Sequence, residues 1–507
     1  MCSIKNVFLG LFILLISFVP LSAQEVTKPL LVPWPQKITF NTGDFIPKRL
    51  IELINKDNQK EVYPIIETFS KDLAESGYVV SASRKKTNPV KSYIILILTN
   101  DNTYDEEGYK LKIDSDITIT ASSANGLFWG TRTALQLLSA GVGSSVSKMD
   151  IEDKPMLKYR GLLIDNARSF HSLPFHLKTI KQMSYYKMNR YQIHFSDHES
   201  YTLPSDKFPD LPTKGRHFSK EDVRILREVA KKYHVEIVPE VDVPGHSRAL
   251  TEGIAGLKCT DVVGNADKLC IGKEETYNIL KELFLEISEM FPGEYWHLGA
   301  DEVHYPDLNA CKCTDCKTRM KQQNFTKGLE LYHYFINEMY GFVKRDKRKM
   351  LVWEGFDPVA KPVINKEIIV CPFDIKHEGR MPSDYMNQEY RILNTSWTPL
   401  YIADGIYMTT PEVIARWTPY MFGAGRSPSP YAYWKKFKET PLIIGAQMCS
   451  WAIEEAAEEG LIFGTGQGFP NYGRPAPRLQ IVAERVWTGA SSSYTNLLQR
   501  VGEAYWD

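Results

Sequence analysis

The sequence has no excess of either charge, and beyond its first residues it has no long apolar segment. Its 507 residues contain 61 Lys and Arg against 61 Asp and Glu, so no net field would attract nucleic acid or an anionic membrane. No apolar run after residue 23 is long enough to span a bilayer. Internal repeats and low-complexity segments are also absent. With 43% hydrophobic and 24% charged residues, the chain has the composition of a globular protein.

Residues 1–23 have the pattern of a secretory signal peptide. Lys5 precedes an apolar run over residues 7–19, and the small residues Ser22 and Ala23 follow it. A membrane anchor would need about 20 apolar residues, and this run is shorter. We therefore expect export to the periplasm or the extracellular space, with cleavage after Ala23.

Export would permit disulfides among the seven cysteines that follow residue 23. Cys259 and Cys270 bracket a polar loop and are a plausible disulfide. Cys311, Cys313 and Cys316 could supply three zinc ligands, but no fourth ligand is obvious and the usual paired CxxC spacing is absent. We therefore favour local structure or another disulfide there, keep a metal as the weaker alternative, and predict no cofactor.

Residues 24–152 have the pattern of a separate, smaller α/β domain. Its strands are expected at 93–98, 109–113 and 117–120, and its helices at 62–76 and 124–138. Acids, histidines and cysteines are not grouped in this part of the chain. We therefore expect this domain to have a structural role rather than a catalytic one.

Residues 153–507 alternate short aliphatic strands with amphipathic helices. The expected strands are 161–165, 190–195, 235–239, 294–298, 350–353, 367–370, 390–393 and 442–446. Four intervening helices are expected at 174–188, 219–233, 276–290 and 329–344. Eight alternations predict a (β/α)8 barrel, whose active site lies at the carboxyl ends of the strands. The alternative is a doubly wound open sheet, but no GxGxxG or GxxxxGK[ST] turn follows any strand.

Acids, histidines and aromatic residues follow these strands, and a barrel would bring them to one rim. In chain order they are Asp165, Arg168, Asp197, His198, Glu199, Glu240, Asp242, His246, Asp301, Glu302, His304, Trp353, Glu354, Phe373, Asp374, Trp397, Tyr401 and Trp451. Asp301 and Glu302 are adjacent and follow two small residues that permit close backbone approach. Their mutual repulsion would raise the pKa of at least one carboxyl, which suits a neutral acid beside an ionised stabiliser.

Several motifs make the sequence resemble the β-N-acetylhexosaminidases of glycoside hydrolase family 20. Residues 297–302, HLGADE, resemble the family's H-x-G-[GA]-D-E signature, and residues 161–168 resemble its G-x-x-x-D-x-[AS]-R motif. Residues 186–189, YKMN, and 239–247, PEVDVPGHS, match two further motifs in the family's order. The segment 107–138 is similar to the end of the family's amino-terminal domain. The resemblance covers nearly the whole mature chain.

The resemblance implies a retaining glycosidase in which the substrate's own 2-acetamido oxygen attacks C1, an exception to the usual pair of protein carboxylates. The implied substrate is a glycan with a terminal β-linked N-acetylhexosamine. Glu302 would be the general acid and base, and Asp301 would hold the acetamide N–H. Arg168 would bind sugar hydroxyls, Asp197 and His246 would orient Glu302, Trp353 and Trp451 would wall the acetamide, and Tyr401 would bond its oxygen.

The sequence departs from the family pattern at positions that contact the O4 and O6 side of the sugar. His198 replaces the second Asp of D-D-x-x-W, and the carboxylate of Y-x-D after Tyr401 is missing or displaced to Asp404. The Glu of W-x-E falls one position late, at Glu454, and Phe373 stands near the place of a Trp. We therefore expect altered specificity, for a galacto epimer or a 6-substituted hexosamine.

Two other functions remain open from the sequence. One is a retaining glycosidase whose nucleophile is a protein carboxylate such as Glu240 or Glu354. The other is a glycan-binding relative that has lost catalysis, although binding alone needs no paired acids. Glu240 and Trp397 are weaker candidates for the substrate site than the residues that match the family's motifs.

Overall fold

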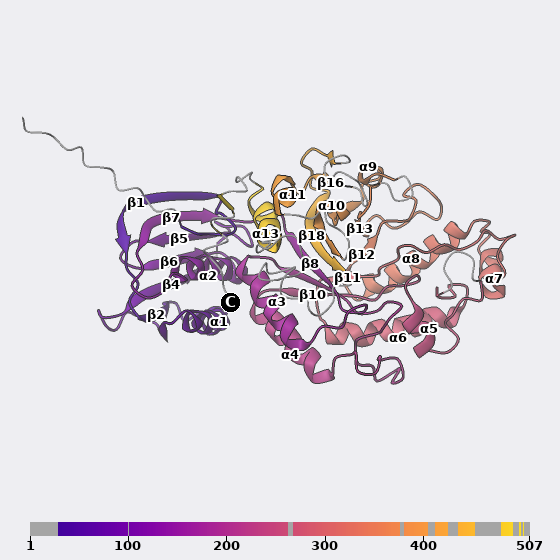
Figure 1. Cartoon of the computed structure of the whole chain (residues 1–507), viewed down its shortest axis with the longest axis horizontal. Helices are drawn as coiled ribbons and strands as arrows, with labels where there is room; N and C mark the ends of the chain where they lie inside the picture. Colours follow the sequence, from indigo (N-terminus) through magenta and orange to yellow (C-terminus); the bar gives the residue numbers. More distant parts are fainter. Residues whose placement is uncertain are drawn as a thin grey trace, which may run out of the picture.

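The computed structural model describes residues 29–99, 101–261, 267–375, 380–403, 411–423, 434–451, 478–489, 496–497 and 500. Two domains follow one another along the long axis of the molecule (Figure 1). The expected signal peptide at 1–23 and the site candidates Asp404 and Glu454 lie outside the described residues. No helix within the described ranges is both long and apolar enough to cross a bilayer.

The amino-terminal domain is built on a seven-stranded mixed sheet. Its strands are β1 (Lys37–Phe45), β2 (Leu50–Asn55), β3 (Val79–Ser83), β4 (Ser92–Leu98), β5 (Tyr109–Ile113), β6 (Ile117–Ala121) and β7 (Val146–Asp153). Across the sheet the order is β1-β7-β5-β6-β4-β2-β3, with antiparallel pairs from β1 to β6 and parallel pairs from β6 to β3. Helices α1 (Val62–Glu75) and α2 (Ala124–Leu138) lie on the side that faces the second domain (Figure 1).

The structure confirms the three strands and two helices predicted for this domain, and it adds four strands. Two of the added strands, β1 and β3, form the edges of the sheet and expose most of their residues. β3 has a largely exposed sequence with no alternating apolar pattern, whereas β1 alternates only over its first residues, where Ile38 and Phe40 pack against the core.

The second domain is a closed barrel of eight parallel strands. They are β8 (Tyr159–Asp165), β9 (Arg190–His194), β10 (Glu236–Glu240), β11 (Tyr295–His297), β12 (Lys349–Trp353), β13 (Ile369–Cys371), β14 (Arg391–Asn394) and β18 (Ile443–Trp451). The barrel closes because β18 pairs in parallel with both β14 and β8. The predicted strands and barrel are confirmed, and the open-sheet alternative is wrong.

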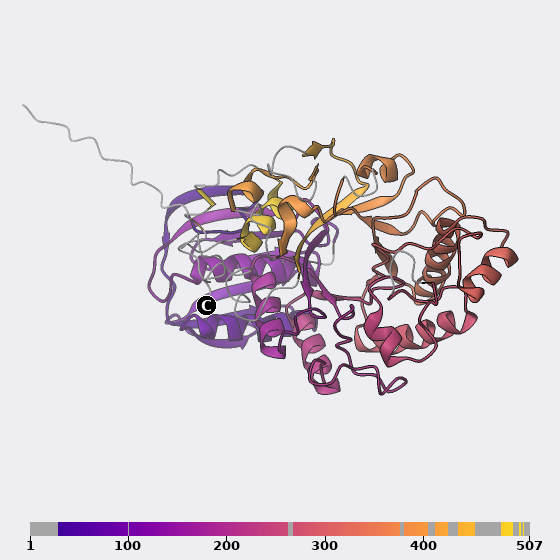
Figure 2. The same cartoon turned by 45° about the vertical axis from the view of Figure 1, so that its right-hand side comes forward.

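The helices lie outside the strands (Figures 1 and 2). The four predicted helices are α3 (Leu173–Tyr185), α4 (Lys220–Lys232), α6 (Glu274–Met290) and α8 (Gly328–Arg345). Shorter helices are α5 (Arg248–Gly253), α7 (Thr314–Gln322), α9 (Pro382–Met386), α10 (Trp397–Leu400), α11 (Pro411–Arg416) and α13 (Arg478–Thr488). The remaining strands are β15 (Tyr401–Ala403), which pairs with β18, and the pair β16 (Met421–Phe422) and β17 (Lys435–Lys436).

Polar side chains inside the barrel form a chain of hydrogen bonds. The hydroxyl of Tyr159 donates to Oε1 of Gln447 at 3.1 Å, and Nε2 of Gln447 donates to Oε1 of Gln192 at 2.9 Å. Nε2 of Gln192 then donates to Oε2 of Glu240 at 2.8 Å. All four side chains are buried, so each polar group needs the partner that the next one supplies. The chain ends at Glu240, directly beneath the carboxyl ends of the strands.

Buried ion pairs join the amino-terminal domain to the amino end of the barrel. Arg160, at the start of β8, donates through Nη1 to Oε2 of Glu107 at 3.0 Å. Lys187, just before β9, places Nζ 3.0 Å from Oδ2 of Asp153. The indole N–H of Trp129 also donates to Glu107 at 3.0 Å. The smaller domain therefore packs against the barrel at the amino ends of β8 and β9, and the carboxyl ends of the strands stay available for chemistry.

Candidate active site

Asp165, the last residue of β8, fixes the arginine that follows it. Its Oδ1 accepts the backbone N–H of Arg168 at 2.9 Å, and its Oδ2 accepts Nη1 of the same residue at 2.9 Å. Nη2 of Arg168 lies 2.6 Å from Oδ2 of Asp197, and its guanidinium sits 5.4 Å from the ring centroid of Trp451. Burial alone would lower the pKa of Arg168, but the charges of Asp165 and Asp197 raise it above its usual value.

Asp197 accepts hydrogen bonds from two histidines and also pairs with Arg168. Nε2 of His194 donates to its Oδ2 at 2.9 Å, and Nδ1 of His246 donates to its Oδ1 at 3.2 Å. Burial opposes ionisation of Asp197, but the hydrogen bonds from His194 and His246 hold its pKa far below its usual value. Asp197 is therefore a fixed anion that sets the orientation of the His246 ring.

The second nitrogen of His246 points to the paired acids. Its Nε2 lies 3.5 Å from Oε2 of Glu302 and 3.9 Å from Oδ2 of Asp301. Burial would lower the pKa of His246, but its hydrogen bonds with Asp197 and Glu302 raise it to about 12. His246 is consequently an imidazolium throughout the neutral range, and it stabilises negative charge on Glu302.

The loop after β11 turns sharply and thereby presents Asp301 and Glu302. Gly299 and Ala300 both have φ near +75°, and Glu302 has φ +48°. A Cβ on Gly299 would lie 2.0 Å from Oδ1 of Asp242, so only glycine permits this approach. The same Asp242 oxygen accepts the backbone N–H of Ala300 at 3.0 Å, which holds the turn. The Asp301 side chain is 16% exposed and the Glu302 side chain 51% exposed.

Asp242 and Asp301 form a buried pair of like charge. Burial raises the pKa of Asp242 well above its usual value, and the charge of Asp301 raises it further. Burial also raises the pKa of Asp301, with the charges of Glu302 and Glu240 adding to the shift although His246 opposes it. Because two adjacent carboxylates cannot both ionise easily, ionised Asp301 disfavours the ionisation of Asp242. Oδ1 of Asp301 is buried and has no hydrogen-bond partner within the described part of the chain.

Five aromatic rings line one side of this rim. The ring centroid of Tyr401 lies 5.3 Å from Trp397, 6.0 Å from Trp451 and 6.4 Å from Phe373. Trp353 lies 5.8 Å from Trp451, so the rings form one continuous cluster. Burial raises the pKa of the Tyr401 hydroxyl well above 10, which keeps it neutral and able to donate a hydrogen bond.

Glu240 lies below the rim and serves the residues above it. Its Oε1 accepts the indole N–H of Trp353 at 2.7 Å, and its Oε2 lies 2.9 Å from Nδ1 of His194. Burial would raise the pKa of Glu240, but His194 and His297 lower it well below its usual value. Glu240 is fully buried, so it positions other site residues rather than facing a ligand.

The structure brings together the predicted residues that it describes and adds two whose roles were not predicted. His194 links Asp197 to Glu240, and Asp242 supports the turn that carries Asp301. The signal for His194 is its position, because Gln192 and His194 alternate with the apolar, buried residues Tyr191 and Ile193. His198 lies beside the rim with its ring centroid 5.1 Å from that of His246, and burial lowers the pKa of its imidazole.

The cysteines differ from the sequence-based prediction. Cys259 and Cys270 form no disulfide with each other, and all seven cysteines in the described ranges are free thiols. Instead, Cys259 and Cys270 approach Cys313 and Cys316, and the four sulfur atoms lie within 4.8 Å of one another. Cys311, the third member of the set expected from the sequence, lies outside this group, so each of the two loops supplies two of the four sulfur atoms.

Comparisons with known proteins match both domains. A family model described as "Glycosyl hydrolase family 20, catalytic domain" matches residues 157–490, and one described as "Glycosyl hydrolase family 20, domain 2" matches residues 28–154. A β-hexosaminidase of Porphyromonas gingivalis is 26% identical over 515 residues, and the match covers 94% of this chain but only 62% of that protein. The α subunit of β-hexosaminidase from Mus musculus is 28% identical, over 78% of this chain and 73% of that protein.

Solved structures show the same fold. An exo-β-N-acetylglucosaminidase from Vibrio harveyi, solved in complex with N-acetylglucosamine, superposes with a TM-score of 0.76 at 21% identity. The match covers 94% of this chain and 76% of that one. A β-N-acetylhexosaminidase from Bacteroides fragilis superposes with a TM-score of 0.74 at 21% identity and covers 94% of both chains.

Proposed function

Because the chain belongs to glycosyl hydrolase family 20, we propose that it is an exo-acting β-N-acetylhexosaminidase that hydrolyses terminal β-linked N-acetylhexosamines by substrate-assisted, retaining catalysis. The observation that carries this proposal is the placement of Asp301 and Glu302 on one turn. One carboxyl is buried beside a second acid, and the other is half-exposed beside a cation. This arrangement suits a proton-transfer role for Glu302 and an electrostatic role for Asp301.

Glu302 is the proposed general acid and base. In the first step it protonates the glycosidic oxygen as the bond to C1 breaks, and in the second it takes a proton from the attacking water. His246, 3.5 Å away and cationic, stabilises the carboxylate that Glu302 becomes between these steps. Because the Glu302 side chain is half-exposed, it can reach a leaving group that extends toward solvent.

Asp301 is the proposed partner of the acetamide group. Its buried Oδ1 can accept the acetamide N–H, which orients the acetamide oxygen toward C1. As that oxygen attacks, positive charge develops on the acetamide, and the Asp242–Asp301 pair places negative charge next to it. Trp353, Trp451 and Tyr401 would surround the acetamide methyl and keep water from it.

A direct protein nucleophile is less well supported. Glu240 is buried and accepts hydrogen bonds from side chains beneath the rim. Glu354 is also buried, and its Oε1 accepts the backbone N–H of Phe373 at 3.0 Å. Carboxylates held in this way are not exposed to the anomeric carbon, so the substrate's own oxygen is the better candidate.

We further propose that the terminal sugar differs from plain N-acetylglucosamine at C4 or C6. This proposal is supported by the departures from the family pattern at His198, at Ala403 and at the positions of Asp404 and Glu454. Export, with removal of residues 1–23, is likewise a proposal, and it is supported by the pattern of the first residues alone.

A panel of aryl β-glycosides varied at C2, C4 and C6 tests these proposals. Glycosides with a 2-acetamido group should be hydrolysed with retention at C1, as followed by NMR, and 2-hydroxy analogues should not. A sugar ester-linked to the protein, detected by mass spectrometry during turnover, would refute substrate assistance. Faster hydrolysis of the GlcNAc glycoside than of GalNAc and 6-substituted analogues would refute the altered specificity. If nothing on the panel is hydrolysed, the glycan-binding alternative gains.

A further inference from the structure

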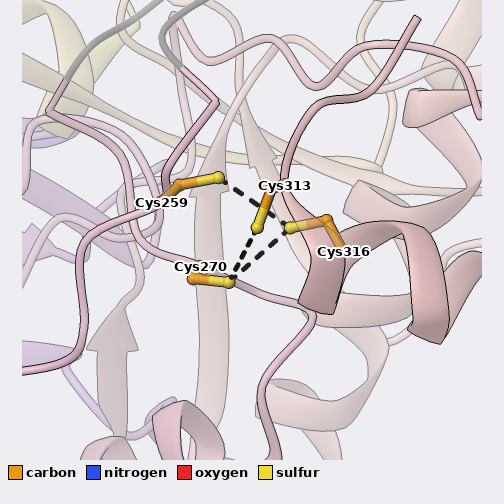
Figure 3. A group of neighbouring side chains, drawn as sticks. All are labelled: Cys259, Cys270, Cys313 and Cys316. Carbon is orange, nitrogen blue, oxygen red and sulfur yellow. Dashed lines mark hydrogen bonds between the residues drawn. The ribbon is translucent and has the colours of Figure 1, made fainter.

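Four cysteine side chains from two separate loops, which follow β10 and β11, converge on one another. Cys259 and Cys270 lie between α5 and α6, and Cys313 and Cys316 lie at the start of α7. Figure 3 shows their four sulfur atoms directed toward a common centre. All four residues are almost fully buried, with at most 2% of any of them exposed.

The distances between the sulfur atoms fit a metal better than disulfides. Sγ of Cys270 lies 3.5 Å from that of Cys313 and 3.8 Å from that of Cys316, and Cys259 lies 3.9 Å from Cys316. A zinc ion with four thiolates at about 2.3 Å places the sulfurs about 3.8 Å apart by tetrahedral geometry. A disulfide requires about 2.05 Å, so any pair would have to move considerably to form one.

The backbone around the cysteines holds them in this arrangement. The N–H of Cys259 donates to the carbonyl of Lys268 at 3.0 Å, and the N–H of Cys270 donates to the carbonyl of Leu257 at 2.7 Å, which pins one pair as a small hairpin. The other pair has the Cys-x-x-Cys spacing at a helix start that is common in structural zinc sites. The two loops pack tightly, because a Cβ on Gly272 would lie 2.2 Å from the backbone nitrogen of Cys316.

The same hairpin is bonded to both loops that carry the paired acids and their histidine. The N–H of Leu269 donates to the carbonyl of Pro244, two residues before His246, at 2.9 Å. Nζ of Lys268 donates to the carbonyl of His304, two residues after Glu302, at 2.8 Å. The hydroxyl of Tyr305 donates to the carbonyl of Leu269 at 2.6 Å. The position of the hairpin therefore bears on the distance between His246 and Glu302.

We propose that Cys259, Cys270, Cys313 and Cys316 bind one Zn²⁺ as a structural site that fixes the loops after β10 and β11 relative to each other. Binding converts four thiols and Zn²⁺ into a tetrathiolate complex and releases four protons, with no change in oxidation state. Because every ligand position is taken by a cysteine, the ion has no open position for substrate. Its role is to hold the loops, and it takes no part in the hydrolysis.

Metal analysis of the full chain, purified in the presence of zinc and a reductant, gives the first test. We expect about one zinc per chain, retained through gel filtration. Replacing zinc by Co²⁺ should produce the visible absorption of a tetrahedral cobalt thiolate, which is independent of enzymatic activity. A mercurial reagent that blocks thiols should release the zinc, as detected with a colorimetric chelator.

Two variants locate the site. Cys316→Ser should lower the zinc content about tenfold or more and lower the melting temperature. Cys311→Ser is the matched control, because Cys311 is also buried in this segment but its sulfur contacts the carbonyl of Cys313 rather than the cluster. The control should keep about one zinc per chain. If Cys316→Ser does not fold, the cobalt spectrum and the mercurial release on the unaltered chain still decide the question.

Three results would overturn the proposal. One is an unaltered chain that contains four free thiols and binds no zinc after reconstitution. Another is a non-reduced peptide map in which these cysteines are joined as disulfides. The last is iron in place of zinc after growth with both metals. None of these measurements depends on glycoside hydrolysis, so a failure of the zinc site and a failure of the proposed activity can be distinguished.

Discussion

Both ends of the barrel bury pairs of opposite charge, but only the carboxyl end also buries acids beside acids. At the amino end, Lys187 meets Asp153 and Arg160 meets Glu107, so each buried charge faces its opposite. Burial would raise the pKa of Glu107, but Arg160 lowers it below its usual value. At the carboxyl end, Arg168 also pairs with Asp197, but Asp242 faces another acid, Asp301, and the pKa of each of these two acids is raised. Matched charges join the two domains, whereas the crowded acids surround the carboxyl proposed to hold the acetamide group.

The largest effect is expected at Glu302, the proposed proton donor at the carboxyl end. Glu302→Gln should lower kcat about 10³- to 10⁴-fold on an aryl N-acetyl-β-hexosaminide, because no acid remains to protonate the leaving group. The side chain is half-exposed, so the melting temperature should change little. Retained affinity for the product sugar serves as the control. A kcat within tenfold of the unaltered enzyme would contradict the assignment.

Breaking a matched pair should act on stability instead. Lys187→Met leaves Asp153 buried without its cation, so the free energy of unfolding should fall by about 3–5 kcal/mol in denaturant titrations. Lys37→Met is a matched control, because Lys37 pairs with Glu152 at 3.1 Å but is 65% exposed, and such pairs contribute at most about 1 kcal/mol. Equal losses in the two variants would show that burial does not distinguish the pairs.

Asp301→Asn should lower kcat about 10²- to 10³-fold, because the amide cannot offset the positive charge that develops on the acetamide. The loss should fall on kcat more than on KM, since the charge exists only as the oxazolinium forms. Steady-state kinetics on one substrate separates the two constants. A loss confined to KM would assign Asp301 to ground-state binding alone.

The smallest expected effect is a change in the pH dependence of stability. The folded pKa of Asp242 is raised above the usual 3.8, so the folded chain keeps a proton that the unfolded chain releases. The resulting stability is fully present below pH 3.8 and is lost as the pH rises toward the folded pKa, by at most about 1.4 kcal/mol per pH unit. Asp242→Asn imitates the protonated acid and should flatten this slope in unfolding titrations from pH 4 to 7. An unchanged slope would show that the raised pKa does not belong to Asp242.

Local patterns predicted the barrel because each strand and helix can be recognised from a few consecutive residues. The eight strands and the helices α3, α4, α6 and α8 are of this kind, and Ser219 caps α4 as its position indicates. The order of the motifs likewise placed Arg168, His246 and the paired acids at one rim. The sequence could predict the features that depend on neighbouring residues. It could also predict those that depend on a position repeated at the end of each strand.

The remaining features depend on pairs that only the fold brings together. Asp242 acts on Ala300 across a gap of 58 residues, and Cys270 meets Cys313 across 43. Cys259 and Cys270 are near in the chain, and this spacing supported a disulfide between them. In the fold, Sγ of Cys316 from the other loop lies 3.9 Å from that of Cys259 and 3.8 Å from that of Cys270. Spacing within one segment cannot reveal partners supplied by another.

The turn that carries the two acids has a consequence for protein engineering. Ala300 and Glu302 adopt left-handed backbone angles that ordinary residues avoid, at about 1–3 kcal/mol each. The turn keeps this shape because Asp242 holds the N–H of Ala300 and the hydroxyl of Tyr332 holds its carbonyl. Transplanting the hexapeptide HLGADE into another barrel would therefore yield a relaxed, misaimed loop unless both remote clamps were transplanted with it.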